Sequence, residues 1–182
     1  MSSQSSARNP ILIVGAGPVG LTMACELARF GVPVRIVDKN SAPTDKSKAL
    51  VVWPRTLELL DKSGAVQPFL DCGFPLHGMN IFQDVKTRLV HLTFEDVSSP
   101  FPFVLALPQS ETERLLETRL QAFGVRVERS TALTHFEQSE EGVRGTVEGP
   151  DGTIEVIKAD WLVACDGGRS TVRHQLGIKL EG

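Results

Sequence analysis

The sequence is poor in the residues that mark disulfide-rich and metal-binding proteins. Its 182 residues include only three cysteines, Cys25, Cys72 and Cys165, which are scattered and form no CxxC pair. This usage argues against a disulfide framework and is typical of a reducing, cytoplasmic compartment. The four histidines show no metal-ligand spacing and have no cysteine pair nearby, so we predict no metal site.

Long apolar runs and basic blocks are missing as well. No uninterrupted apolar run approaches the ~20 residues that a transmembrane helix needs, so we expect no membrane association. The net charge is only −3, and no basic block interleaves with aromatic residues. Nucleic acid is therefore not an expected partner.

What is present is the composition of a globular chain, with 41% hydrophobic and 23% charged residues. Residues 1–9 are polar and are predicted to be a disordered leader. Residues 10–182 are predicted to form one domain. Within it, the proline-rich stretch 65–108 alternates like β structure and is predicted to be an inserted β-rich layer or part of a second, substrate-binding domain.

The pattern of strands and helices predicts an α/β fold. A continuous apolar run at 11–14 and a second at 34–37 are typical of parallel strands covered on both faces, and a helix starting at Pro18 separates them. Another helix is expected from Pro54 to Gly64, and a capping box of Ser110 and Glu113 predicts a third. The later segments are expected to be a strand at 125–129, a three-stranded meander at 132–138, 143–148 and 153–158, a buried strand at 161–165 and a short closing helix.

The stretch ILIVGAGPVG carries the first functional motif. Gly15, Gly17 and Gly20 have the GxGxxG spacing directly after a strand, and Pro18 starts the following helix. These glycines permit a tight turn, a close approach of pyrophosphate to the backbone, and close packing of helix on sheet. Asp38 ends the second strand, where an acid binds a ribose hydroxyl. The motif therefore predicts a dinucleotide site, with NAD and FAD both compatible.

The second motif is DGGRSTVR, which follows the strand at 161–165. Asp166 and Gly167 are followed by Ser170 and Arg173, which gives the form DGxxSxxR. Together with the opening motif, this sequence resembles the class A flavoprotein monooxygenases, the family of para-hydroxybenzoate and phenol hydroxylases. The resemblance implies that Asp166 and Gly167 contact the cofactor and that Arg173 supports the fold.

Two further segments resemble the same family. KALVVWPRTLELL is similar to the segment in which a basic residue precedes an RT-E helix, and here those residues are Lys48 and Arg55. LPQSETERLL is similar to the segment in which a glutamine reaches the flavin, and here that residue is Gln109. The resemblance thus implies FAD contacts from Lys48, Arg55 and Gln109 as well.

The resemblance implies a Rossmann-like FAD-binding fold, with a parallel sheet, a crossover β-meander, helices and a partial β-rich substrate-domain insertion. The implied function is the FAD-binding portion of an NAD(P)H-dependent monooxygenase that hydroxylates a small aromatic or phenolic substrate. The family's later glycine-aspartate fingerprint is not found by Gly182, so the chain lacks the C-terminal part of the family. It also contains no tyrosine, so a phenol-binding tyrosine cannot come from this portion.

Several alternatives stay open at this point. The chain could be a non-catalytic FAD- or nucleotide-binding remnant or interaction module, or an NAD-dependent dehydrogenase. Arg55 could be a solvated residue at a helix start, and Asp166 could simply cap the turn that follows it. No catalytic residue is identified. A parallel sheet that stops early leaves an uncovered edge, through which self-association is possible.

Overall fold

The computed structural model describes residues 8–44 and 49–181. Most of the predicted leader, residues 1–7, lies outside the described residues. The chain divides into two compact units: one runs up to Pro43 and resumes at Leu116, and the other is Thr44–Leu115. Each unit is described by itself.

The first unit is built on a parallel sheet. Its strands are β1 (Ile11–Val14), β2 (Val34–Val37), β8 (Val127–Glu128) and β12 (Trp161–Ala164), in the order β12-β1-β2-β8. Helix α1 (Pro18–Arg29) connects β1 to β2 and completes the predicted βαβ unit. The middle of β1 is fully buried, as the continuous apolar run predicts.

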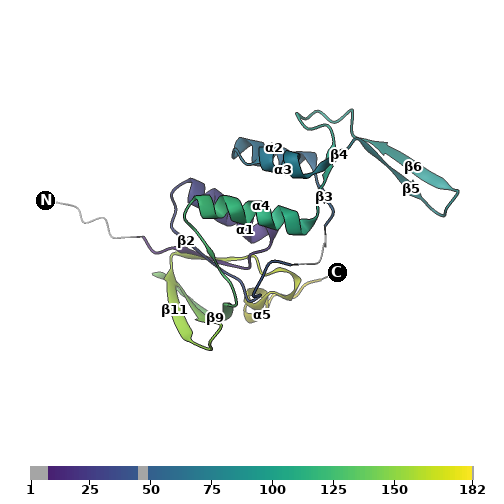
Figure 1. The fold of residues 1–182 in the computed structure, drawn as a ribbon. Helices are drawn as coiled ribbons and strands as arrows, with labels where there is room; N and C mark the ends of the chain where they lie inside the picture. Colours follow the sequence, from purple (N-terminus) through teal and green to yellow (C-terminus); the bar gives the residue numbers. More distant parts are fainter. Residues whose placement is uncertain (1–7, 45–48, 182) are drawn as a thin grey trace. The chain divides into compact units, whose positions relative to one another are not determined.

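Helix α1 lies on one face of this sheet, and a three-stranded antiparallel meander covers the opposite face (Figure 1). Its strands are β9 (Ala132–Ser139), β10 (Gly142–Glu148) and β11 (Ile154–Ala159), which confirms the predicted meander. Apolar side chains from β1, β2 and all three meander strands share one core with Val172 of the closing helix α5 (Thr171–Gln175). A short 3-10 turn, η1 (Gly167–Arg169), lies between β12 and α5.

The second unit combines short strands with helices. Helices α2 (Pro54–Lys62) and α3 (Val66–Cys72) follow β3 (Val51–Val52), and α4 (Gln109–Ala122) starts in this unit and ends in the first. One sheet has the order β3-β7-β4, and β5 pairs with β6 as a separate hairpin. The remaining strands are β4 (Phe74–Leu76), β5 (Gly78–Phe82), β6 (Arg88–Thr93) and β7 (Val104–Ala106).

Three local predictions are wrong. The start of the β-like stretch is helix α3, because Pro68 lies in a first helical turn, where its missing N–H costs nothing, and Val66 and Phe69 bury one face. Ser110 is not a cap, since the N–H of Thr112 donates to the carbonyl oxygen of Pro108 and the helix starts at Gln109, two residues earlier than predicted. Strand β12 was predicted to be buried but is only partly buried, because it is an edge strand of the sheet among the described residues.

Within the described residues, every helix falls short of the length and hydropathy that a membrane span requires.

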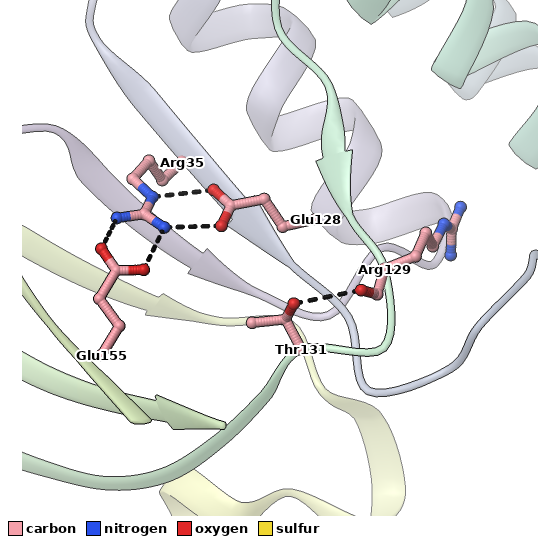
Figure 2. Close-up of polar contacts among 5 residues, drawn as sticks. All are labelled: Arg35, Glu128, Arg129, Thr131 and Glu155. Atoms are coloured by element: carbon pink, nitrogen blue, oxygen red, sulfur yellow. Dashed lines mark hydrogen bonds and ion pairs between the residues drawn. The ribbon is translucent and has the colours of Figure 1, made fainter. Parts of the chain in front are cut away.

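Arg35 joins the parallel sheet to the meander (Figure 2). Its guanidinium donates to both carboxylate oxygens of Glu128 on β8, at 2.8 and 2.6 Å, and to both of Glu155 on β11, at 2.6 and 3.0 Å. Such bidentate pairs are the stronger class of ion pair. The hydrogen bonds from Arg35 lower the pKa of Glu155 below its ordinary value. One side chain therefore holds three strands from two layers.

Replacing Glu155 tests this link through its pH dependence. Because the folded-state pKa of Glu155 is lowered, its stabilising contribution is present above the unfolded pKa of about 4.3 and is lost as pH falls through the folded value. We expect Glu155→Gln to lower the free energy of unfolding by less than about 1 kcal/mol at pH 7, since the pair is partly exposed.

The difference from the unsubstituted protein should shrink below about pH 4 in urea-unfolding curves. Glu148→Gln, at an exposed position on β10, is the matched control. A pH-independent difference for Glu155→Gln would show that the ion pair is not its source.

Candidate functional site

The turn after β1 lies directly against the turn after β12. Gly15 has a φ of 101°, which favours glycine, and its N–H donates to the carbonyl oxygen of Val37 at 2.8 Å. A Cβ on Gly15 would overlap the carbonyl oxygen of Cys165 and would lie 2.9 Å from the Cα of Asp166. The structure therefore brings the two sequence motifs, about 150 residues apart, into backbone contact.

The other two glycines of the motif differ in what surrounds them. A Cβ on Gly20 would overlap the carbonyl oxygen of Gly15 and would lie 3.2 Å from the Cβ of Cys165, so this glycine is required by packing. A Cβ on Gly17 would meet no described atom within 4 Å. Since the fold gives Gly17 no steric reason to lack a side chain, its open surroundings fit a ligand that approaches the backbone there.

Gly17 is also the N-cap residue of α1, and Pro18 is the first helical residue. Among the described residues, no side chain caps this helix start, and its first turn contains no acidic residue. The N–H groups of a first helical turn lack partners within the helix and carry a partial positive charge. Helix start and open space together suit a phosphate group.

Asp38 is buried at the carboxyl end of β2 and is tied to the same turn. Its Oδ2 accepts a hydrogen bond from the N–H of Ala16 at 2.6 Å. Its Oδ1 accepts from the backbone N–H and from the side-chain amide of Asn40, both at 2.8 Å. A carboxylate has about four acceptor positions, so three such bonds leave capacity for one more donor. The predicted ribose contact of Asp38 stays a prediction.

Sequence reasoning missed Asn40. The spacing Asp-x-Asn is typical of a turn in which an aspartate accepts from the backbone two residues later, and that signal was available. Asn40 also fixes the neighbouring loop, because its carbonyl oxygen accepts from the N–H of Ser130 at 3.0 Å. The ends of β2 and β8 are thereby joined.

Asp166 uses its two carboxylate oxygens differently. Oδ2 accepts from the N–H of Thr171 at 2.7 Å and from that of Val172 at 3.4 Å, so it adds a cap to the first turn of α5 beside the N-cap residue Ser170. Oδ1 is buried and has no hydrogen-bond partner among the described residues. A buried acceptor without a partner is costly and calls for one, which a bound ligand can supply. The capping role and the predicted ligand role are therefore compatible.

The residues around Asp166 stabilise its turn. Gly167 has a φ of 74°, and a Cβ there would meet no described atom within 4 Å. The hydroxyl of Ser170 accepts from the N–H of Arg173 at 3.0 Å, and the Arg173 guanidinium donates to the carbonyl oxygen of Gly168 at 3.1 Å. These contacts support the turn, which is the role predicted for Arg173.

The other predicted contact residues belong to the second unit. The exposed Arg55 pairs with Glu58 at 2.6 Å, one turn along α2, and this pairing lowers the pKa of Glu58. The side-chain amide of Gln109 donates to the buried Glu113 at 2.8 Å, and its backbone N–H donates to Ala49 at 3.0 Å. Lys48, which precedes Ala49, lies outside the described residues. The FAD contacts of these three residues stay predictions.

The cysteine thiols of the first unit are poor nucleophiles. Burial raises the pKa of Cys25 to about 11, and burial together with the Asp166 carboxylate raises the pKa of Cys165. Both are therefore protonated at neutral pH, whereas the thiolate is the reactive form. Among the described residues, no group of three or more histidine, cysteine or acidic side chains could hold a metal ion.

The strand–turn–helix unit, the open position at Gly17 and the adjoining Asp166 turn together have the geometry that suits a dinucleotide. A comparison with protein families decides which one, because the model of the FAD binding domain matches residues 8–182. The chain belongs to the FAD binding domain family.

Relatives of this FAD-binding chain include proteins named as monooxygenases and a protein named as a synthase. It is 41% identical over 175 residues to a 12-dehydrotetracycline 5-monooxygenase/anhydrotetracycline 6-monooxygenase of Streptomyces rimosus, covering 96% of this chain and 34% of that protein. It is 36% identical over 172 residues to a dialkyldecalin synthase of Streptomyces rugosporus, covering 94% of this chain and 35% of that protein. The crystal structure of aklavinone-11 hydroxylase with FAD and aklavinone superposes with a TM-score of 0.79 at 28% identity, covering all of this chain and 36% of that one.

These comparisons confirm the resemblance to class A flavoprotein monooxygenases, the Rossmann-like fold and FAD as the cofactor. The FAD-binding chain spans about a third of the length of the curated relatives that it matches. The open position at Gly17 and the unpartnered oxygen of Asp166 fit this cofactor, since one leaves room for a pyrophosphate and the other is an acceptor for a hydroxyl or N–H group; the FAD contacts of both residues stay predictions.

Two glycine substitutions distinguish a position that is open for a ligand from one that is closed by packing. We expect Gly20→Ala to lower the free energy of unfolding by about 2–3 kcal/mol, because the new methyl group overlaps the Gly15 carbonyl. Gly17→Ala should change it by less than about 1 kcal/mol, as a change of N-cap residue does. Its FAD dissociation constant should nevertheless rise at least about tenfold.

Denaturant unfolding without FAD and fluorescence titration with FAD measure the two effects. Gly149→Ala is the control, because Gly149, like Gly17, has no positive φ, and a Cβ there would make only ordinary contacts, the nearest at 3.4 Å, but it lies in the turn between β10 and β11. Unchanged FAD affinity in Gly17→Ala would contradict a pyrophosphate site at this position.

Proposed function

We propose that this chain is the FAD-binding portion of an NAD(P)H-dependent flavin monooxygenase that hydroxylates an aromatic or phenolic substrate. The observation that carries the proposal is the backbone contact between the Gly15 turn and the Asp166 turn. This contact joins an open helix start to an unpartnered carboxylate oxygen in one site. Relatives whose names give tetracycline intermediates as substrates support the aromatic class.

The chain's own residues would bind and orient the cofactor. The start of α1 would hold the pyrophosphate, with Gly17 leaving room for it and Pro18 fixing the helix start. Asp38 would bind the adenosine ribose, and Asp166 and Gly167 the flavin side of the cofactor. For Lys48, Arg55 and Gln109, the proposed FAD contacts rest on the resemblance to the monooxygenase family alone. FAD itself supplies the redox chemistry, which the protein positions and shields from water.

A second candidate function is FAD binding without monooxygenase activity. It is supported by the relative that is named as a dialkyldecalin synthase and not as a monooxygenase. In that case the chain would hold FAD as part of an enzyme of another reaction class, and it would not turn over NAD(P)H. FAD uptake without NAD(P)H oxidation or oxygen consumption, in the presence of aromatic substrates, would favour this alternative.

The location and self-association of the chain belong to the same proposal. Free thiols at Cys25, Cys72 and Cys165 support a cytoplasmic location. The outer side of β12 has no partner strand among the described residues, and Trp161 on this strand is 69% exposed. This edge would allow self-association, which sedimentation velocity at increasing protein concentration would detect.

Removing the carboxylate of Asp166 tests the proposed site. We expect Asp166→Ala to raise the FAD dissociation constant at least about tenfold and to slow NAD(P)H oxidation at limiting FAD. It should also lower the free energy of unfolding by about 1 kcal/mol, because the N–H groups of Thr171 and Val172 lose their acceptor while the Ser170 N-cap of α5 stays.

Asp151→Ala is the matched control. Asp151 likewise accepts a backbone N–H, that of Thr153 at 3.0 Å, but it lies in the turn between β10 and β11. If Asp151→Ala and Asp166→Ala reduced FAD affinity equally, the Asp166 turn would not be part of the cofactor site.

A further inference from the structure

Gln175 forms an unusual attachment between α5 and the meander. Its side-chain amide nitrogen donates to the carbonyl oxygen of Phe136 at 2.6 Å, and its amide oxygen accepts from the N–H of Phe136 at 3.3 Å. The side chain thus pairs with both backbone groups of one residue on β9, which is an outer strand of the meander. This replaces the partner that a further strand would give Phe136.

A second attachment lies one turn earlier in the same helix. Val172 is buried in the core that it shares with the ring of Phe136. Residues three apart lie on the same face of a helix, so Val172 and Gln175 fix α5 at two points. The apolar contact of Val172 alone would leave the rotation of α5 about its axis less defined. The added hydrogen bonds of Gln175 fix this rotation.

The rotation of α5 determines where Asp166 lies. The N–H groups of Thr171 and Val172 hold Oδ2 of Asp166, so the carboxylate is oriented by the first turn of α5. The other oxygen, Oδ1, is the buried acceptor without a partner among the described residues. A continuous series of contacts therefore runs from the backbone of Phe136 through Gln175 and α5 to the free oxygen of Asp166.

We propose that Gln175 is a positioning residue of the cofactor site, which orients the Asp166 carboxylate toward FAD by fixing α5 on β9. This inference rests on the proposed function of Asp166. Gln175 lies nine residues beyond Asp166 and acts through hydrogen bonds to the protein backbone rather than through the cofactor.

The test is Gln175→Met in the intact protein, a change that keeps the length of the side chain and removes both hydrogen bonds. We expect the FAD dissociation constant to rise about fivefold, the size of effect that one net hydrogen bond gives. In the Asp166→Ala background, the same substitution should leave the FAD dissociation constant unchanged, because its target is already missing.

Amide hydrogen exchange gives a readout that needs no FAD. We expect the N–H groups of Thr171 and Val172 to exchange faster in Gln175→Met, because their acceptor is less well held. Thr134→Val is the matched control. It removes another side-chain bond of β9, from the Thr134 hydroxyl to the carbonyl oxygen of Thr146 at 3.1 Å, without touching α5.

Two results would overturn the inference. One is an equal loss of FAD affinity from Gln175→Met with and without Asp166. The other is unchanged exchange at Thr171 and Val172. If the unsubstituted protein takes up no FAD, the proposed function fails, and the exchange rates still decide whether Gln175 orients the Asp166 turn.

Discussion

The contact between the Gly15 turn and the Asp166 turn, which carries the proposed cofactor site, depends on the parallel pairing of β1 with β12. Their register places Val14 beside Ala164, and the N–H of Cys165 donates to the carbonyl oxygen of Val14 at 2.7 Å. Because parallel strands end at the same edge of a sheet, the turns that follow them meet there. A shift of one residue would separate the Gly15 turn from the Asp166 turn and would also turn the buried side chains of β1 to the opposite face.

Other layers of the first unit hold this edge in place. The meander buries one face of β1 and β2, and Arg35 ties it to the sheet through carboxylates on two further strands. At the carboxyl ends, Asp38 joins the glycine turn to Asn40, and Asn40 joins the loop after β8. The open position at Gly17 is thus surrounded by backbone that is fixed from several sides, as a preorganised phosphate site requires.

The parts that the sequence could predict are those set by local patterns. The apolar runs of β1 and β12, the GxGxxG spacing and DGxxSxxR each depend on residues within one short segment. Contacts between distant segments could not be predicted. Gln175 meets Phe136 across 39 residues, and nothing in either segment indicates the other.

Local signals also failed where tertiary packing decided the outcome. The stretch at Val66–Cys72 contains a proline and was expected to be β-like, yet burial of Val66 and Phe69 favours a helix there. Glu113 was expected to complete a capping box with Ser110. It is instead buried and accepts from the side chain of Gln109, a pairing that the spacing of four residues allowed but did not require.

The central claim is that the two turns form one FAD site, and amide hydrogen exchange of the intact protein with and without FAD tests it most directly. The account predicts that FAD slows exchange both in the first turn of α1, around Gly17 and Gly20, and in the turn from Asp166 to Val172. Slower exchange in only one of these segments, or in neither, would contradict it.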